Sequence, residues 1–329
     1  MTPSSKPDEL VRLADTLTKS AETPKKRMLV IVNPHATTVS ARLRNLVIYA
    51  LGARFEVEAI DTQRRDHGIE LCRDAASEGY DVVVAFGGDG TANEAVNGLA
   101  GSATPLTMLP GGLTNVIAQT LGIPNDVVDA TERLLHLADR WEPRLIDLGS
   151  VNGRRFAVAA GIGLDAAVVA RVERQPQRKA RLRAPYYLYS AITTFLSSYL
   201  VAPPRLLVEV DGRELEGIAV LVQNSDPYTF FGTRPVHMAE GAGLETGTLA
   251  GIVLERALPH DIPAVLVRAL SEQLAITGHR RVEGFSGARE LTVRAAGSHA
   301  LPIQVDGDMI GESTVARFTV EPRALGVIA

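Results

Sequence analysis

The sequence predicts an α/β fold, in which an N-terminal domain with a largely parallel sheet precedes a mainly antiparallel, β-rich domain. The first half alternates short, unbroken apolar runs with segments of helical periodicity, which is the pattern of βαβ units. From about Arg144 onward, short strand-like segments follow one another, and the dipeptides Asn152-Gly153 and Asp211-Gly212 are typical of hairpins. At 329 residues, the chain also exceeds the length at which one hydrophobic core usually stops growing, so two domains are expected.

The N-terminal domain is expected at residues 27–143, after a polar leader. Residues 1–26 contain no apolar signal-peptide core, so we expect them to be mobile. The unbroken apolar run Met28–Val32, which suits a parallel strand covered on both faces, predicts the first strand, and further strands are expected at Phe55–Ile60, Val82–Phe86 and Pro105–Leu109. Helical spacing predicts helices around Leu43–Leu51 and at Asp66–Glu78, before the stop signal Gly79.

The β-rich domain is expected at residues 144–320. Short apolar segments between turn signals predict strands at Arg154–Ala160, Arg205–Val210, Ile218–Gln223, Leu249–Leu254, Leu291–Ala295 and Ala316–Val320. Helices are expected at Gly163–Val172, Pro185–Leu200 and His260–Ile276.

Composition narrows the class of protein. With 46% hydrophobic and 22% charged residues, the chain is neither disordered nor fibrous. The net charge of −4 argues against a nucleic-acid binder, and no run of about 20 apolar residues predicts a membrane span. Cys72 is the single cysteine, so no internal disulfide can form, which suits a reducing compartment. We expect a cytoplasmic protein, with peripheral contact at the inner face of the membrane as an option.

The loops after three of the predicted parallel strands predict a ligand site. They are Asn33-Pro34, the segment Gly87–Thr91, and Pro110–Gly112. Because ligands of such sheets bind at the carboxyl ends of the strands, these loops should lie close together.

The segment Gly87–Thr91, Gly-Gly-Asp-Gly-Thr, has the character of a phosphate cradle. Its glycines let a ligand approach the backbone, and its amides join the following helix N-terminus in offering donors to an anion. Asp89 would repel phosphate directly, so it makes better sense as a ligand of the Mg²⁺ that accompanies ATP. The alternative is a tight turn whose acidic side chain faces water.

The segment Pro110–Asn115 is a second glycine turn into a helix and strengthens the phosphate interpretation. Neither turn matches the Walker A pattern, because no Gly-x-x-x-x-Gly-Lys-Ser/Thr occurs. Gly161–Ala166 fits the dinucleotide pattern superficially, but it lies outside the βαβ half, which argues against that use.

The run Gly87–Leu99, followed by Pro110–Ala118, resembles the diacylglycerol kinase catalytic domain, whose superfamily includes sphingosine and ceramide kinases. The likeness extends from about Arg27 through most of the chain. Phe156–Ala166 is similar to the family's Gly-Phe-Asp-Ala segment, and Gln304–Asp308 to its late Asp-Gly-Glu motif. The resemblance implies ATP in a cleft between an α/β domain and a β-rich domain, with residues of about 321–329 returning to the first.

The resemblance also implies roles for individual residues. It places nucleotide contacts at Asn33, Pro34, Thr37, Thr62, Gly87, Gly88, Asp89, Gly90, Thr91, Asn93, Glu94, Gly112, Thr114 and Asn115. It places the catalytic base at Asp306 or Asp308, and we favour Asp308 slightly. Without the resemblance, Asp306-Gly307 is most simply a hairpin turn.

Three positions depart from the family pattern. The first loop, Asn33–Thr37, lacks the usual glycine, and Leu113 stands where the family has a threonine, with Thr114 one place later. Thr246 replaces the key aspartate of the family's Asp-Asp-Gly segment, which carries a structural magnesium.

The function implied is ATP-dependent phosphorylation of a lipid hydroxyl, most simply diacylglycerol to phosphatidic acid. The alternatives are a kinase of the same superfamily acting on a sphingoid base, ceramide or NAD, and a nucleotide-binding regulator without turnover. A lipid kinase must reach the membrane surface, and the basic and aromatic residues of Arg171–Leu200 suit such contact. A solvated basic loop before a buried helix is the equal alternative for that segment. The sequence does not predict an oligomeric state.

Overall fold

The computed structural model describes residues 25–138, 141–163 and 204–329, apart from residues 233, 257, 259, 270, 272 and 273. The expected leader at residues 1–26 lies almost wholly outside these described residues. So do the helix expected at Gly163–Val172 and the expected membrane-contact segment Arg171–Leu200.

A parallel sheet forms the N-terminal part. Its strands are β1 (Arg27–Val32), β2 (Glu56–Asp61), β3 (Val82–Gly87) and β4 (Leu106–Pro110), in the order β2-β1-β3-β4. Every residue of β3 and β4 is buried, which is why these strands are almost entirely apolar. β2 and β3, the next two strands along the chain, lie on opposite sides of β1. The carboxyl ends of β1 and β3 therefore flank a topological switch point.

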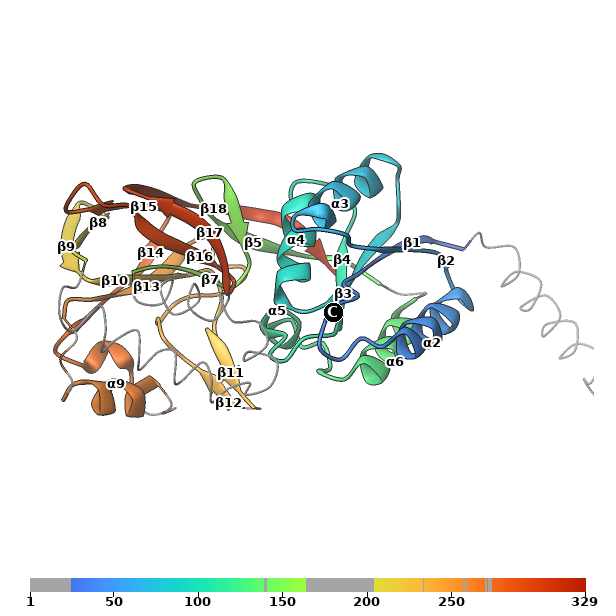
Figure 1. Ribbon diagram of the computed structural model, residues 1–329, viewed down its shortest axis with the longest axis horizontal. Coiled ribbons are helices and arrows are strands. Elements are labelled where there is room, and N and C mark those ends of the chain that lie inside the picture. The colour runs from blue at the N-terminus through green and yellow to red at the C-terminus, as the bar shows by residue number, and fades with distance from the viewer. Residues whose placement is uncertain are drawn as a thin grey trace, which may run out of the picture.

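Helices cover both faces of this sheet (Figure 1). α2 (Ala41–Gly52) and α6 (Val127–Leu137) contact each other on one face, while α3 (His67–Ser77) and α4 (Asp89–Leu99) pair on the other. The short α5 (Val116–Thr120) follows β4. Polar residues begin two of these helices: Ser40 accepts a hydrogen bond at α2 and Asp126 accepts two at α6.

The C-terminal part is built from antiparallel strands. Those that belong to the same sheet as β1–β4 are β5 (Arg144–Val151), β6 (Arg154–Phe156), β8 (Leu206–Val210), β9 (Arg213–Gly217), β15 (Glu290–Ala295) and β18 (Val315–Val327). A six-stranded sheet consists of β14 (Val282–Ala288), β13 (Leu249–Leu254), β10 (Ala219–Gln223), β7 (Ala159–Ile162), β16 (Leu301–Val305) and β17 (Asp308–Ser313), in that order. A two-stranded hairpin, β11 (Thr229–Phe231) and β12 (Arg234–Val236), α9 (Ile262–Ala269) and the short 3-10 helix η2 (Ile276–Gly278) complete the described elements.

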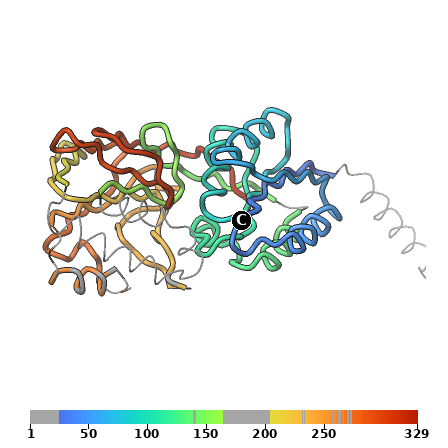
Figure 2. Tube along the Cα trace, in the orientation of Figure 1, coloured from blue at the N-terminus to red at the C-terminus, as the bar shows by residue number. Residues whose placement is uncertain are grey.

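Strand β18 runs from the C-terminal part into the N-terminal part (Figure 2). Its first residues pair with β15, and Val327 near its end pairs in parallel with Leu106 of β4. The strand bends at a bulge, where Arg323 has φ 52° and donates its N–H to the Asp147 carboxylate at 2.8 Å. One ten-stranded sheet therefore joins the two parts. We propose a domain boundary between residues 143 and 144, because strand pairing there changes from mainly parallel to mainly antiparallel.

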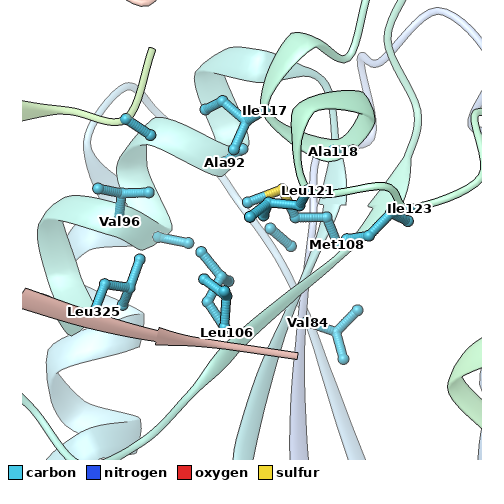
Figure 3. Packing of buried hydrophobic residues seen from close by; sticks show 14 of the residues in the cluster. Val84, Ala92, Val96, Leu106, Met108, Ile117, Ala118, Leu121, Ile123 and Leu325 are labelled. Atoms are coloured by element: carbon cyan, nitrogen blue, oxygen red, sulfur yellow. The ribbon is translucent and has the colours of Figure 1, made fainter. Parts of the chain in front are cut away.

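The core of the N-terminal part lies between the sheet and its helices (Figure 3). Leu106 from the sheet is fully buried near Val96 of α4, and Val84 of β3 and Ile117 of α5 also belong to this cluster. Leu325, supplied by β18, is 1% exposed in the same cluster. The last strand of the chain is therefore part of the first core.

The predicted fold class is confirmed, with corrections to individual elements. The strand expected at Arg154–Ala160 is broken into β6 and β7, because the main chain between them turns to donate hydrogen bonds to a carboxylate. The helix expected at His260–Ile276 is shorter, ending at Ala269. The strand expected at Ala316–Val320 extends to Val327. Within the described part of the chain, no helix has both the length and the apolar character needed to cross a bilayer.

Candidate active site

The two glycine turns pack directly against each other. A Cβ atom placed on Gly112 would lie 2.8 Å from the Gly88 Cα, and the Gly111 N–H donates to the Gly87 carbonyl at 2.7 Å. The first loop joins them, because the Thr38 N–H donates to the Gly111 carbonyl at 3.1 Å. Loops after β1, β3 and β4 therefore meet at one edge of the sheet.

Replacing Gly112 with alanine is expected to separate these turns. The added methyl group would meet the Gly88 backbone, which cannot move aside like a flexible side chain, so we expect about 1–3 kcal/mol of destabilisation. ATP affinity should fall with it, as measured by titration calorimetry beside thermal unfolding. Gly52→Ala is the matched control, because nothing lies within 4 Å of its Cβ position. Equal behaviour of the two variants would contradict the predicted role of the contact between the turns.

Asp89 links the first turn to the second. Its Oδ1 accepts the Ile117 N–H at 3.2 Å, and its Oδ2 accepts the Thr114 hydroxyl at 3.0 Å. The carboxylate thus serves the N-terminus of α5 rather than facing water freely. Although Asp89 keeps some exposure, desolvation of its carboxyl raises its pKa to about 6, against the lowering effect of the Ile117 and Thr114 hydrogen bonds.

Asn115 holds the second turn in shape. It has a left-handed backbone with φ 46°, and its Oδ1 accepts the Gly112 N–H at 2.8 Å. Its Nδ2 donates to the Gly112 carbonyl at 3.0 Å and to the Asn125 side chain at 2.7 Å. These hydrogen bonds join both ends of the Asn115 amide to protein groups, so the residue shapes the nucleotide loop.

The remaining nucleotide residues expected in the first two loops lie at the same edge. Asn33 donates from Nδ2 to the Thr91 hydroxyl at 3.3 Å, and Thr62 donates its N–H to the Val32 carbonyl at 2.8 Å. Pro34 and Thr37 are exposed in the loop after β1.

Glu94 and Asn93, both on α4, form hydrogen bonds with protein groups outside that helix. The two carboxylate oxygens of Glu94 accept the N–H groups of Asp66 at 2.9 Å and Gly68 at 2.8 Å. Glu94 therefore caps α3 from the neighbouring helix. Asn93 is 1% exposed and donates to the Asp306 carboxylate at 2.9 Å.

Asp306 occupies a hairpin turn and a buried polar junction at once. It and Gly307 join β16 to β17 with φ 47° and 86°, the backbone that Asp-Gly hairpins favour. Its carboxylate accepts the N–H groups of Ala157, Val158 and Ala159 at 2.9–3.0 Å, besides the Asn93 amide. Burial raises the pKa of Asp306, although these four donors oppose the rise.

Asp308 lies over the first glycine turn. A Cβ atom on Gly90 would come within 2.8 Å of the Asp308 Oδ2, so the carboxylate lies close against the backbone of the first glycine turn. The hairpin delivers this acid from β17 to the N-terminus of α4, across the junction of the two parts. The sequence-predicted acid and the predicted phosphate cradle therefore meet in space.

The structure adds residues that sequence reasoning missed. Arg154 binds Asp66 and Asn93, and Arg65 donates to the Met309 carbonyl. Only the Asn152-Gly153 turn signal before Arg154 hinted that this arginine begins a strand. A groove of about 550 Å³ adjoins these contacts, lined by Arg65, Asp66, Asn152, Arg154, Ile303, Met309, Ile310, Gly311, Glu312 and Ser313.

The segment around Thr246 is held by its own turn. Its hydroxyl lies 3.0 Å from the carbonyls of Gly243 and Thr248, and the neighbouring Gly247 N–H donates to Asp147 at 2.6 Å. Among the described residues, no group of three or more histidine, cysteine, aspartate or glutamate side chains is arranged to hold a metal ion. A neutral hydroxyl therefore replaces the carboxylate that a structural magnesium would need.

Two family models match the chain in succession. Residues 27–151 match the diacylglycerol kinase catalytic domain, and residues 157–329 match the YegS C-terminal NAD kinase beta sandwich-like domain. The break between the matches falls where β6 gives way to the main-chain turn that binds Asp306.

Individual relatives extend the likeness. A diacylglycerol kinase of Staphylococcus aureus is 29% identical over 309 residues, covering 93% of each chain. One from Bacillus subtilis is 34% identical over 143 residues, which is 42% of this chain and 46% of that one. The crystal structure of a Bacillus anthracis diacylglycerol kinase has the same fold, with a TM-score of 0.69, 20% identity, and coverage of 93% of this chain and 98% of that one.

The two matches together span nearly all of the described chain, and the glycine turns and late acidic hairpin they contain meet in one site. The chain belongs to the diacylglycerol kinase catalytic-domain family and is an ATP-dependent lipid kinase.

Proposed function

We propose that this enzyme transfers the γ-phosphoryl group of ATP to the hydroxyl of diacylglycerol, forming phosphatidic acid. The observation that carries the proposal is the approach of the Asp308 carboxylate to Gly90 in the first glycine turn. An acid at that place lies where a phosphate held by the turn would meet an acceptor hydroxyl.

ATP is expected to bind at the edge formed by the loops after β1, β3 and β4. The amides of Gly88–Thr91 and the N-terminus of α4 face the phosphates, with Asn33, Thr91 and Thr114 as side-chain partners. Pro34, Thr37 and Thr62 line the same edge. Asn93, Glu94 and Asn115 hold the loops in place through their contacts with protein groups.

Asp89 fits a supporting role toward Mg²⁺. A carboxylate can accept about four hydrogen bonds, and Thr114 and Ile117 supply two, so its remaining lone pairs can bind the water shell of the ion. Mg²⁺ usually keeps several waters and takes its other ligands from substrate phosphates, so one protein carboxylate suffices. When bound, the ion neutralises the charge of the β- and γ-phosphates.

Asp308 is the better base of the two acids. Asp306 already accepts four hydrogen bonds and fixes the hairpin, whereas Asp308 stands at the turn. We propose that Asp308 takes the proton of the lipid hydroxyl as its oxygen attacks the γ-phosphorus, while the bond to ADP breaks. The carboxyl then releases the proton to solvent.

Diacylglycerol is the proposed acceptor because a relative that matches 93% of the chain is a diacylglycerol kinase. A sphingoid base, ceramide or NAD as acceptor, and nucleotide binding without turnover, are the competing hypotheses. We propose that the enzyme acts from the cytoplasm, at the inner face of the membrane. Arg171–Leu200, outside the described residues, stays the proposed peripheral contact.

Phosphate transfer from radiolabelled ATP to lipids in mixed micelles tests this function. Parallel reactions would contain diacylglycerol, ceramide, sphingosine or NAD, each with and without Mg²⁺. We expect phosphatidic acid as the main product, formed only with Mg²⁺. Preferential labelling of another acceptor would transfer the proposal to that substrate. Magnesium-dependent ATP binding without any labelled product would favour the regulator.

A further inference from the structure

A chain of side chains joins the loop before α3 to the catalytic hairpin. The Arg154 Nη1 donates to the Asp66 Oδ1 at 2.8 Å, while its Nε and Nη2 donate to the Asn93 Oδ1 at 3.1 and 2.8 Å. Asn93 in turn donates to the Asp306 Oδ2 at 2.9 Å. The path therefore runs from Asp66 through Arg154 and Asn93 to the residue that sets the hairpin of Asp308.

The Asp66 carboxylate can bind Arg154 because Glu94, and not Asp66, caps the N-terminus of α3. It stands at the N-terminus of α3 with φ 62°, and its side chain makes no capping hydrogen bond there. Glu94 accepts the N–H groups of Asp66 and Gly68 in its place. The freed carboxylate reaches across to Arg154 on β6. The N-terminus of α3 therefore has no cap from the Asp66 side chain, whose carboxylate binds Arg154 in the C-terminal part of the molecule.

The neighbouring residue makes a second contact of the same kind. Arg65 donates to the carbonyl of Met309, which directly follows Asp308. Two consecutive residues of the loop after β2 therefore bind the C-terminal part, one at the start of β17 and one at β6. Arg154 has a side-chain exposure of 20%, so its three hydrogen bonds are shielded more than those of a surface ion pair.

We propose that Arg154 is a positioning residue for phosphoryl transfer, which aligns Asp308 with the glycine turn by holding Asp66 and Asn93 together. The inference rests on the proposed role of Asp308. Only arginine presents a planar fork that can bind a carboxylate and an amide oxygen at once; a lysine ammonium lacks this fixed geometry. Phosphoryl transfer depends mainly on positioning, so a small displacement of the base lowers the rate strongly.

Arg155 provides a matched control on the same strand. Its Nε binds Glu321 at 2.8 Å, with a side-chain exposure of 30%, so Arg155→Gln also removes one partly exposed ion pair. That ion pair has no side-chain link to Asp306. Arg154→Gln is expected to lower kcat about 10–100-fold at saturating ATP, with KM for ATP changed less than about threefold. The kcat of Arg154→Lys should lie between those of the wild type and Arg154→Gln. Arg155→Gln should keep the wild-type kcat.

Hydrogen exchange supplies a readout that does not depend on activity. The N–H groups of Ala157, Val158 and Ala159 donate to Asp306, so their exchange should accelerate in Arg154→Gln and stay unchanged in Arg155→Gln. Should Arg154→Gln fold poorly, Asp66→Asn serves instead, because that side chain is 47% exposed. Equal kcat and equal exchange in the Arg154 and Arg155 variants would overturn the inference. A wild-type enzyme that phosphorylates no lipid would instead refute the proposed function, and the exchange result would still test the alignment.

Discussion

Asparagine in place of Asp308 is expected to lower kcat about 10²–10⁴-fold, because an amide cannot accept the proton of the attacking hydroxyl. The side chain keeps its size, so the approach to Gly90 is preserved and ATP affinity should change little. Initial rates of phosphatidic acid formation, with ATP binding measured by calorimetry, test both halves of this expectation.

Asp306→Asn offers the informative comparison. An amide there would turn its NH₂ group toward main-chain donors, so we expect a loss of stability on the order of 3 kcal/mol together with lost activity. Asp211→Asn is the control, because Asp211 has φ 49° in an equivalent Asp-Gly hairpin. An Asp308→Asn enzyme with near-normal kcat would show that Asp308 is not the base.

Asp89→Asn is expected to raise the free energy of unfolding of the protein and to lower its catalytic activity. The amide oxygen can still accept the Ile117 N–H, and its NH₂ group can donate to the Thr114 hydroxyl, so both contacts survive. The buried charge disappears, and with it the support for the water shell of Mg²⁺. We expect activity to fall about 10–100-fold, as for other residues that act through a metal's outer shell.

The stability gain should depend on pH in a defined way. A carboxyl whose pKa rises from 3.8 to about 6 on folding binds more protons in the folded state, so its stabilising contribution is lost as pH rises through about 6. Asp89→Asn and wild type should therefore unfold alike below about pH 4 and diverge above it. The full shift corresponds to about 3 kcal/mol, and partial solvent contact reduces the expected gain to about 1–2 kcal/mol.

Asp126→Asn is the matched variant for the effect on activity. Asp126 also accepts main-chain hydrogen bonds at a helix start, at 2.8 and 3.2 Å, but it is exposed, so it serves as the control for activity. Its replacement should leave activity unchanged. Denaturant titrations at pH 4 and pH 8 would measure the difference in stability between Asp89→Asn and wild type. A destabilised Asp89→Asn protein at pH 8 would contradict the desolvation argument.

Local patterns were sufficient for much of the fold. The apolar run Val82–Phe86 and the mainly apolar segment Leu106–Leu109 are buried along their whole length, as expected of strands in a parallel sheet covered on both faces. Asn152-Gly153, Asp211-Gly212 and Asp306-Gly307 all form hairpin turns with left-handed φ angles, as the dipeptides predict. In each case the physical cause lies within a few residues of the signal, so the sequence displays it.

Long-range contacts were beyond those patterns. Asp306 is both a hairpin residue and a buried acceptor of four hydrogen bonds, and nothing near it in sequence shows the second role. Glu94 was expected at the nucleotide, and nothing near it in sequence shows that its carboxylate also caps α3, more than 20 residues earlier in the chain. Asp89 was expected to face the metal, and its carboxylate also serves the start of α5.

The sequence by itself determined the parallel sheet, its two glycine turns and the turn dipeptides, because apolar periodicity and backbone preferences act over short distances. The tertiary structure alone decided that Gly88 packs on Gly112, that β18 completes the first core, and that Arg154 ties Asp66 to Asn93. Those contacts join residues far apart in the chain. Their existence depends on how two sheets and their helices settle against each other, which no local pattern records.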